Sequence, residues 1–134
     1  MELQVIGIDT NILIRWITLD DPIQCRKVAE VFQRHHLTEE IFVADTVLIE
    51  LEWVLSSIYN FQREQISDAL RMIIRTRQFL FRNKETIIRA IDQYNNGERD
   101  FSDCMIGELG HEFNVKTYTF DKGLKNNSNF IILK

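Results

Sequence analysis

Four carboxylates occupy positions that a chain of alternating strands and helices would bring to one place. Asp9 and Asp121 each follow a short run of residues typical of a β-strand. Asp103 lies near the start of a helical pattern, and Glu50 interrupts the apolar pattern of another predicted helix. Crowded carboxylates repel one another, so a fold that gathers them usually does so around a hard divalent cation. The four acids therefore indicate a metal-dependent enzyme with Mg²⁺ or Mn²⁺ held by carboxylate oxygens.

Each acid also has a structural interpretation. Asp9 can cap the helix that begins just after it, and Asp121 can belong to an ordinary turn. Glu50 lies at the border of the apolar face of its helix, where a glutamate is often solvated. Asp100 is a natural N-cap, whereas Asp103 lies one turn further along beside apolar residues and is harder to explain as a cap. The joint placement of the acids, more than any single one, supports a metal site.

Strand and helix patterns alternate along the chain, which is typical of an α/β fold. We expect strands at residues 3–8, 41–43, 79–81, 115–120 and 130–133. We expect helices at residues 12–17, 21–33, 46–58, 63–76, 83–96 and 100–113. The predicted architecture is a compact α/β/α sandwich on a mostly parallel four- to five-stranded sheet, formed by a single domain of residues 1–134. Ligands of such sheets bind at the carboxyl ends of the strands, where Asp9 and Asp121 are expected.

The composition is that of a folded globular protein of 134 residues, 45% of them hydrophobic. Cys25 and Cys104 lie far apart and form no CxxC pair, so the sequence suggests neither a disulfide framework nor a zinc site. No apolar run approaches the roughly 20 residues needed to span a bilayer, and the N-terminus lacks the features of a signal peptide. We therefore expect a cytoplasmic protein with no membrane segment.

Charge is unevenly distributed in a chain whose formal net charge is −4. Residues 1–60 hold ten acids and four Lys or Arg, whereas residues 61–99 hold five acids and eight Lys or Arg. The basic surplus of the middle segment could contact nucleic-acid phosphates, or it could be a solvated helix surface. The charge pattern alone leaves both interpretations open.

The same acids lie in a longer pattern that resembles the PIN-domain ribonucleases, in particular the VapC-type toxins of bacterial toxin–antitoxin pairs. The resemblance covers the whole chain, and the order and spacing of its motifs are more specific than any one motif. It begins with the segment Ile-Gly-Ile-Asp-Thr-Asn-Ile-Leu-Ile-Arg. The matching segments are residues 6–15, 20–22, 47–55, 100–104 and 117–121.

The resemblance implies a set of metal-binding catalytic residues, namely Asp9, Glu50, Asp103 and Asp121. Asn11 and Thr119 match positions that support these acids or an ordered water. Asp100 matches a frequent additional acid. All four main positions hold the expected acid, so nothing in the sequence suggests an inactive member.

The implied activity is Mg²⁺- or Mn²⁺-dependent hydrolysis of phosphodiester bonds in RNA. Single-stranded loops are the natural substrate because their unstacked bases can enter a site, and the resemblance implies structured RNA such as a tRNA anticodon loop. It further implies a homodimer and a protein antitoxin that inhibits the enzyme. The protein would then be the toxin component of a toxin–antitoxin pair.

Other functions remain open from the residues alone. A phosphatase with an aspartyl nucleophile could use Asp9, but the haloacid dehalogenase pattern requires a second Asp where Asn11 stands. A receiver domain requires an Asp at the end of the third strand, and residues 79–82 offer none. A non-catalytic module could use the acids to bind a basic segment of a partner protein. Absence of both Mg²⁺ or Mn²⁺ binding and nuclease activity would favour that module.

Overall fold

The computed structural model describes residues 4–97 and 99–134, which include every predicted site residue. Its strands are β1 (Ile6–Ile8), β2 (Ile41–Val43), β3 (Phe79–Leu80), β4 (Thr117–Thr119) and β5 (Phe130–Ile132). Its helices are α1 (Thr10–Thr18), α2 (Pro22–Arg34), α3 (Asp45–Ser57), α4 (Arg63–Arg75), α5 (Lys84–Asn95) and α6 (Phe101–Glu112), with a short 3₁₀ helix η1 (Lys122–Leu124). The predicted α/β class is confirmed, and all the strands except β2 are shorter than the sequence pattern indicated.

The strands pair in parallel, as expected, but they are divided between two sheets. The first sheet has the order β1-β2-β3, with Ile6 beside Ile41 and Ile41 beside Phe79. The second contains β4 and β5, with Thr117 beside Phe130. The sequence pattern predicts one sheet of four or five strands, whereas within the described residues no pairing of β1 with β4 joins the two.

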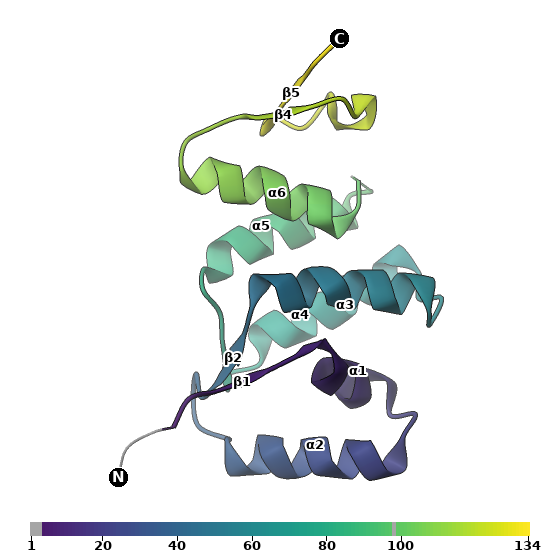
Figure 1. Cartoon of the computed structure of the whole chain (residues 1–134), viewed down its shortest axis with the longest axis vertical. Helices are drawn as coiled ribbons and strands as arrows, with labels where there is room; N and C mark the ends of the chain where they lie inside the picture. The colour runs from purple at the N-terminus through teal and green to yellow at the C-terminus, as the bar shows by residue number, and fades with distance from the viewer. Residues whose placement is uncertain (1–3, 98) are drawn as a thin grey trace.

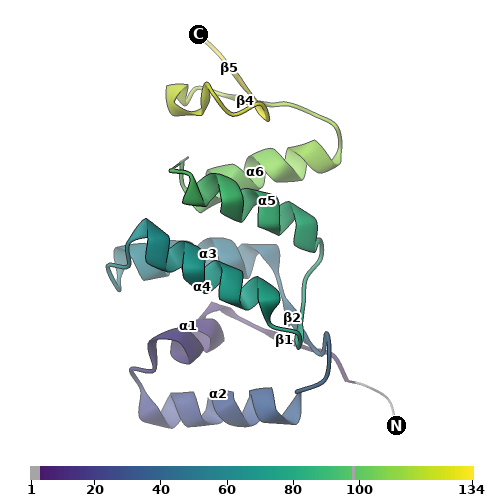
Figure 2. The ribbon, with the colours of Figure 1, turned by 180° about the vertical axis from the view of Figure 1, so that it is seen from behind.

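The elements are stacked along the long axis of the molecule (Figure 1). The helices α2 and α1 lie at one end, followed by the β1–β3 sheet, then α3 and α4, and then α5 and α6. The strands β4 and β5 lie at the opposite end, beyond α6. The view from behind shows the same order, so helices separate the two sheets (Figure 2). This arrangement explains why five parallel strands do not form one sheet.

The hydrophobic core is centred on the helices between the two sheets. Leu51 of α3, Ile73 of α4, Ile91 of α5 and Phe101 of α6 are almost fully buried in one cluster, which also includes Phe79 of β3. Apolar side chains at helical spacing allow each of these helices to contribute to the cluster. Burial of such side chains supplies the main favourable term in folding.

Several predicted helix ends are confirmed and others are wrong. Asp21 caps α2 by accepting a hydrogen bond from the Gln24 amide, and Asn83 caps α5 in the same way. The helix expected at 46–58 begins at Asp45, with Ala44 at the N-cap position. The helices expected to end at Ile58 and Phe113 each end one residue earlier, and both of these side chains are exposed.

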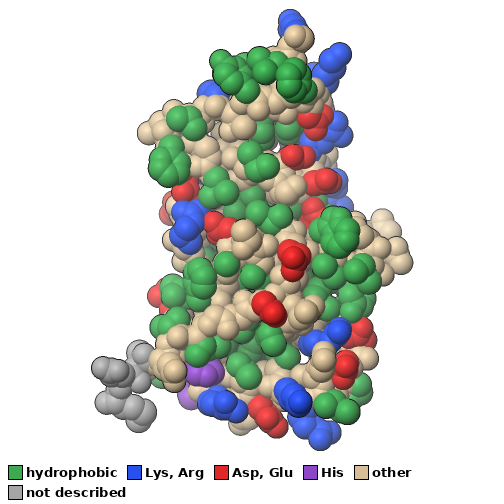
Figure 3. Space-filling model, viewed as in Figure 1, with side chains coloured by type: hydrophobic (Ala, Val, Ile, Leu, Met, Phe, Trp, Pro, Cys, Tyr) green, Lys and Arg blue, Asp and Glu red, His purple; other side chains and the backbone are tan. Residues whose placement is uncertain are grey.

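The β4–β5 sheet packs closely on α6 at two glycines. A Cβ atom on Gly107 would lie 2.7 Å from Phe130 Cε2, and one on Gly110 would lie 2.9 Å from Thr117 Oγ1. Larger residues at these positions would force the sheet away from the helix. On the other side, hydrophobic side chains gather at the β4–β5 end of the surface, with basic side chains beside them (Figure 3).

None of the helices in the described part of the chain has the length and apolar composition required to cross a membrane. The longest, α2, α3 and α4, have 13 residues each, well short of the roughly 20 that a bilayer-spanning helix needs.

Candidate active site

Asp9 is held at the junction of β1 and α1. It follows the last residue of the strand, and its carboxylate accepts a hydrogen bond from the Ile12 amide at 3.3 Å as the N-cap of α1. With Asn11 it lines a cavity of about 270 Å³ between α1 and α2. The capping interpretation of Asp9 is therefore correct, and because the side chain is exposed, its second oxygen remains accessible to a ligand.

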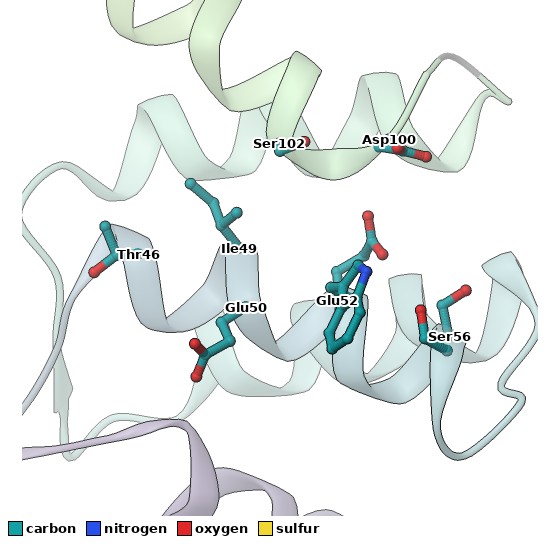
Figure 4. A pocket seen from close by; sticks show the side chains of 9 residues that line it. Thr46, Ile49, Glu50, Glu52, Ser56, Asp100 and Ser102 are labelled. Carbon is teal, nitrogen blue, oxygen red and sulfur yellow. The ribbon is translucent and has the colours of Figure 1, made fainter.

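Glu50 and Glu52 leave α3 in different directions. Figure 4 shows Glu50 pointing toward the purple segment that contains β1 and α1. Glu52 points the other way, toward the start of α6, where Asp100 and Ser102 lie. Glu50 is exposed, whereas Glu52 is 8% exposed. Of the two glutamates, only Glu50 has its carboxylate on the side of β1 and α1.

A second group of acids surrounds the start of α6 and the end of β4. The charges of Asp100 and Asp121, together with burial as the larger cause, raise the pKa of Asp103. Arg99 donates from Nη2 to Asp121 Oδ1 at 2.6 Å, and this bond lowers the pKa of Asp121. Arg99 also partly offsets the repulsion at Asp103. Asp100 and Asp121 are therefore close enough to Asp103 for their charges to act on it.

The supporting residues have definite local roles. Thr119 Oγ1 accepts a hydrogen bond from the Asp121 amide at 3.0 Å, and so holds the turn that presents this carboxylate. Asp100 occupies the N-cap position of α6 without a side-chain capping bond. Arg15, on the helix that follows Asp9, donates to Gln24, Asp20 and Tyr59 and joins α1 to neighbouring segments.

The predicted acids thus form two groups. We call Asp9 and Glu50 the N-terminal acids, and Asp100, Asp103 and Asp121 the C-terminal acids. Within residues 4–97 and 99–134 of one chain, no three His, Cys, Asp or Glu side chains lie close enough together to hold a metal ion. The charges of Asp100 and Asp121 act on Asp103, whereas those of Asp9 and Glu50 are not among the causes of its pKa shift. The four-residue metal site therefore stays a prediction.

Sequence reasoning did not identify Glu52 as part of the site region. On a helical wheel it lies at the border of the apolar face opposite Glu50, where solvation is common, but in the structure it accepts a hydrogen bond from the Phe101 amide at 3.0 Å. Glu52 therefore caps α6 in place of Asp100. It also lines a cavity of about 580 Å³ between α3 and α6, together with Glu50, Trp53 and Asp100. No pattern in the residues around Glu52 indicates that it would cap a helix so far along the chain.

The cap formed by Glu52 predicts opposite effects for two substitutions. Burial, and then the charge of Asp100, raise the pKa of Glu52, so the folded protein binds this proton more tightly than the unfolded chain. Stability should therefore fall as pH rises from the ordinary glutamate pKa through the raised one. Glu52→Gln keeps an acceptor for the Phe101 amide without the charge, and should raise the free energy of unfolding by about 1 kcal/mol at pH 8.

Glu52→Ala removes the acceptor and should lower the free energy of unfolding by about 1–2 kcal/mol. Urea denaturation at pH 5 and pH 8 measures both variants against the wild type. A Glu52→Gln protein that is less stable than the wild type at pH 8 would show that the charged carboxylate is required at the start of α6.

Comparison with known proteins agrees with the predicted fold. The model of the PIN domain family matches residues 6–129, a range that includes Asp9, Glu50, Asp103 and Asp121. A protein of Aquifex aeolicus (strain VF5), named VapC ribonuclease, is 24% identical over 110 residues, which cover 81% of each chain. Since the family model covers nearly the whole sequence, the chain belongs to the PIN domain family.

Proposed function

We propose that this protein is an endoribonuclease of the VapC type, the toxin of a toxin–antitoxin pair. The observation that carries this proposal is the PIN domain match over residues 6–129, a range within which the four predicted acids lie. The similarity to the Aquifex aeolicus protein supports the same activity. A protein antitoxin is the partner that such a toxin requires.

The proposed site residues are Asp9, Glu50, Asp103 and Asp121. Their oxygen donors suit a hard divalent cation such as Mg²⁺ or Mn²⁺, and both N-terminal acids are exposed. When bound, such an ion neutralises the carboxylates, polarises the phosphate and lowers the pKa of a water. Carboxylate oxygens are therefore suitable ligands for such an ion. In the described part of one chain, however, the four acids are divided between two groups and do not form a single set of ligands.

The substrate we propose is RNA in an unpaired region, such as a tRNA loop. Bases of an unpaired strand can be separated and placed against a protein, which the stacked bases of a duplex cannot. Acids that lie on the surface, and not inside a closed pocket, are accessible to a polymer such as RNA. Such a substrate can approach and leave the site from the side. Within this surface, Arg99 beside Asp121 is a cation that can contact a phosphate.

A non-catalytic acidic binding module is the second candidate. The separation of the two groups of acids in one chain favours it, since binding a basic peptide requires no common metal ion. The two candidates differ in what they need: hydrolysis requires the cation, whereas electrostatic docking of a basic segment weakens with added salt of any kind.

Removal of divalent metal tests the proposed function. Purified protein should cleave an unpaired RNA and a tRNA in Mg²⁺ or Mn²⁺, lose this activity with EDTA, and regain it when either ion is restored in excess. Gel analysis of end-labelled RNA measures the cleavage, and a thermal melt with EDTA checks that the protein stays folded. Cleavage that persists in EDTA would contradict the metal site, and no cleavage in either metal would favour the binding module.

A further inference from the structure

Trp53 is a large aromatic residue that the fold does not use for packing. It lies on α3 and is 60% exposed. Trp16, in contrast, makes edge contacts with Phe32 and Phe79 beside the core. Within the part of the chain that the structure describes, the indole of Trp53 makes no ring contact and its N–H donates no hydrogen bond. An exposed indole offers a flat apolar surface together with a donor, which suits it for binding a ligand.

Trp53 lies next to one of the proposed site residues. It follows Glu50 by three positions on α3, and residues at this spacing are neighbours on a helix surface. Both side chains line the cavity of about 580 Å³ between α3 and α6. The cavity therefore adjoins the place where we propose that RNA is cleaved.

The lining of this cavity suits an uncharged group better than a phosphate. It contains three carboxylates, those of Glu50, Glu52 and Asp100, and among the described residues no Lys or Arg. Carboxylates repel a phosphate, whereas they accept hydrogen bonds from N–H groups. A nucleobase is flat and uncharged, and adenine, cytosine and guanine each carry an amino group that can donate to a carboxylate. Uracil carries no amino group.

Hydrogen-bond acceptors lie on both sides of the cavity. Figure 4 shows Asp100 and Ser102 at the start of α6, and Ser56 on α3. Asp100 is exposed and occupies the N-cap position of α6 without a capping bond. Among the residues that the structure describes, neither its carboxylate nor the two hydroxyl groups make a hydrogen bond. These acceptors are therefore available to the edge of a base in the cavity.

We infer that this cavity binds an unpaired RNA base that carries an amino group. The base stacks on the indole of Trp53, as bases of single-stranded RNA stack on aromatic side chains. The carboxylate of Asp100 accepts a hydrogen bond from the amino group. The cavity volume of about 580 Å³ lies within the roughly 300–1,000 Å³ that is typical of small-ligand sites. The inference rests on the proposed nuclease for the place of this base in the substrate, whereas its binding test requires no cleavage.

Tryptophan fluorescence measures the binding directly. A short unpaired cytosine oligonucleotide, added with Ca²⁺ in place of Mg²⁺, should quench the emission of the wild type, because a stacked base quenches the indole that it contacts. Trp53→Phe keeps an aromatic surface and leaves Trp16 as the source of emission, since the chain has two tryptophans. This variant should bind the oligonucleotide without quenching. Absence of quenching in the wild type, or equal quenching in Trp53→Phe, overturns the inference.

Cleavage kinetics measure what the indole contributes to substrate binding. Trp53→Ala should raise KM about tenfold and leave kcat within about twofold, as expected for the loss of one base–aromatic contact. Trp53→Phe should recover most of this loss. Ile58→Ala is the matched control, because it removes another exposed apolar side chain at the end of α3, outside the cavity, and its KM should equal that of the wild type. An unchanged KM in Trp53→Ala would overturn the inference and leave the indole to a protein partner.

A comparison of two pyrimidines tests the role of Asp100. Cytosine and uracil have rings of the same size, but only cytosine carries an amino group. The wild type should bind a cytosine oligonucleotide about fivefold more tightly than a uracil one, and Asp100→Asn should reduce this difference because an amide also donates. Equal affinity of the wild type for both oligonucleotides would overturn recognition of the amino group. Quenching without cleavage in Mg²⁺ or Mn²⁺ would support the base site and contradict the nuclease alone.

Discussion

Replacing Asp9 with Asn should reduce RNA cleavage by about 10³-fold or more, which corresponds to about 4 kcal/mol of transition-state stabilisation. The effect should be confined to activity. Asp9 caps α1 through one carboxylate oxygen, which accepts from the Ile12 amide, and the Asn side chain provides the same acceptor with equal preference at this position. The substitution therefore removes a metal-binding charge while it preserves the helix start. End-labelled RNA in saturating Mg²⁺ or Mn²⁺ gives the rate.

Asp68→Asn is the matched control, because Asp68 is an exposed acid on α4 outside both groups; its rate should equal that of the wild type. Asp9→Ala separates the two roles of the residue. It should be as inactive as Asp9→Asn and, in addition, about 1 kcal/mol less stable, since the cap is lost. Full cleavage by a folded Asp9→Asn protein would remove this carboxylate from the mechanism.

The helices and strands could largely be predicted because the signals for them lie in a few neighbouring residues. The strand at 41–43 is found with the predicted bounds, and the helices expected to start at Asp21 and Asn83 do so, with these residues as their N-caps. An N-cap depends on residues within one turn, and a buried strand depends on a short apolar run. Both can be recognised without knowledge of the rest of the chain.

Long-range pairing was not predictable in the same way. The sequence shows that Thr117–Thr119 is a strand, but its neighbour depends on where α6 packs. The close contacts of Gly107 and Gly110 with β5 and β4 decide that question, and a glycine in a helical pattern has no unique meaning beforehand. The expected single sheet, and with it the meeting of Asp9 and Asp121, rested on this undetermined step.

The orientation of α3 has a similar origin. Glu50 and Glu52 lie two positions apart on opposite borders of the apolar face, so a helical wheel treats them alike. The structure separates them because only the border of Glu52 meets the start of α6, where the Phe101 amide needs an acceptor. The wheel placed both acids at the borders of one face, whereas Glu52 is buried with Leu48, Leu51 and Leu55. Packing against α6 therefore decides which side of α3 is buried.

Glu108→Ala should lower the free energy of unfolding by about 2–3 kcal/mol, the largest stability effect that we expect from removing a single carboxylate. Glu108 is 3% exposed on α6. It accepts from Arg89 at 2.8 Å and Gln93 at 2.6 Å, both on α5, and from Asn129 at 2.7 Å, just before β5. Alanine leaves these donors without their acceptor and loosens the attachment of the β4–β5 sheet to α6.

The effect should depend on pH in a defined direction. The hydrogen bonds from Arg89, Asn129 and Gln93 outweigh burial and lower the pKa of Glu108. Its stabilising contribution is therefore complete above the ordinary glutamate pKa and is lost as pH falls through the lowered value. Urea denaturation from pH 7 to pH 3 should show the wild type and Glu108→Ala converging in acid. Glu30→Ala, at an exposed site on α2, should differ from the wild type by less than about 0.5 kcal/mol throughout. A Glu108→Ala protein that matches the wild type at pH 7 would show that the buried carboxylate does not hold the β4–β5 sheet on α6.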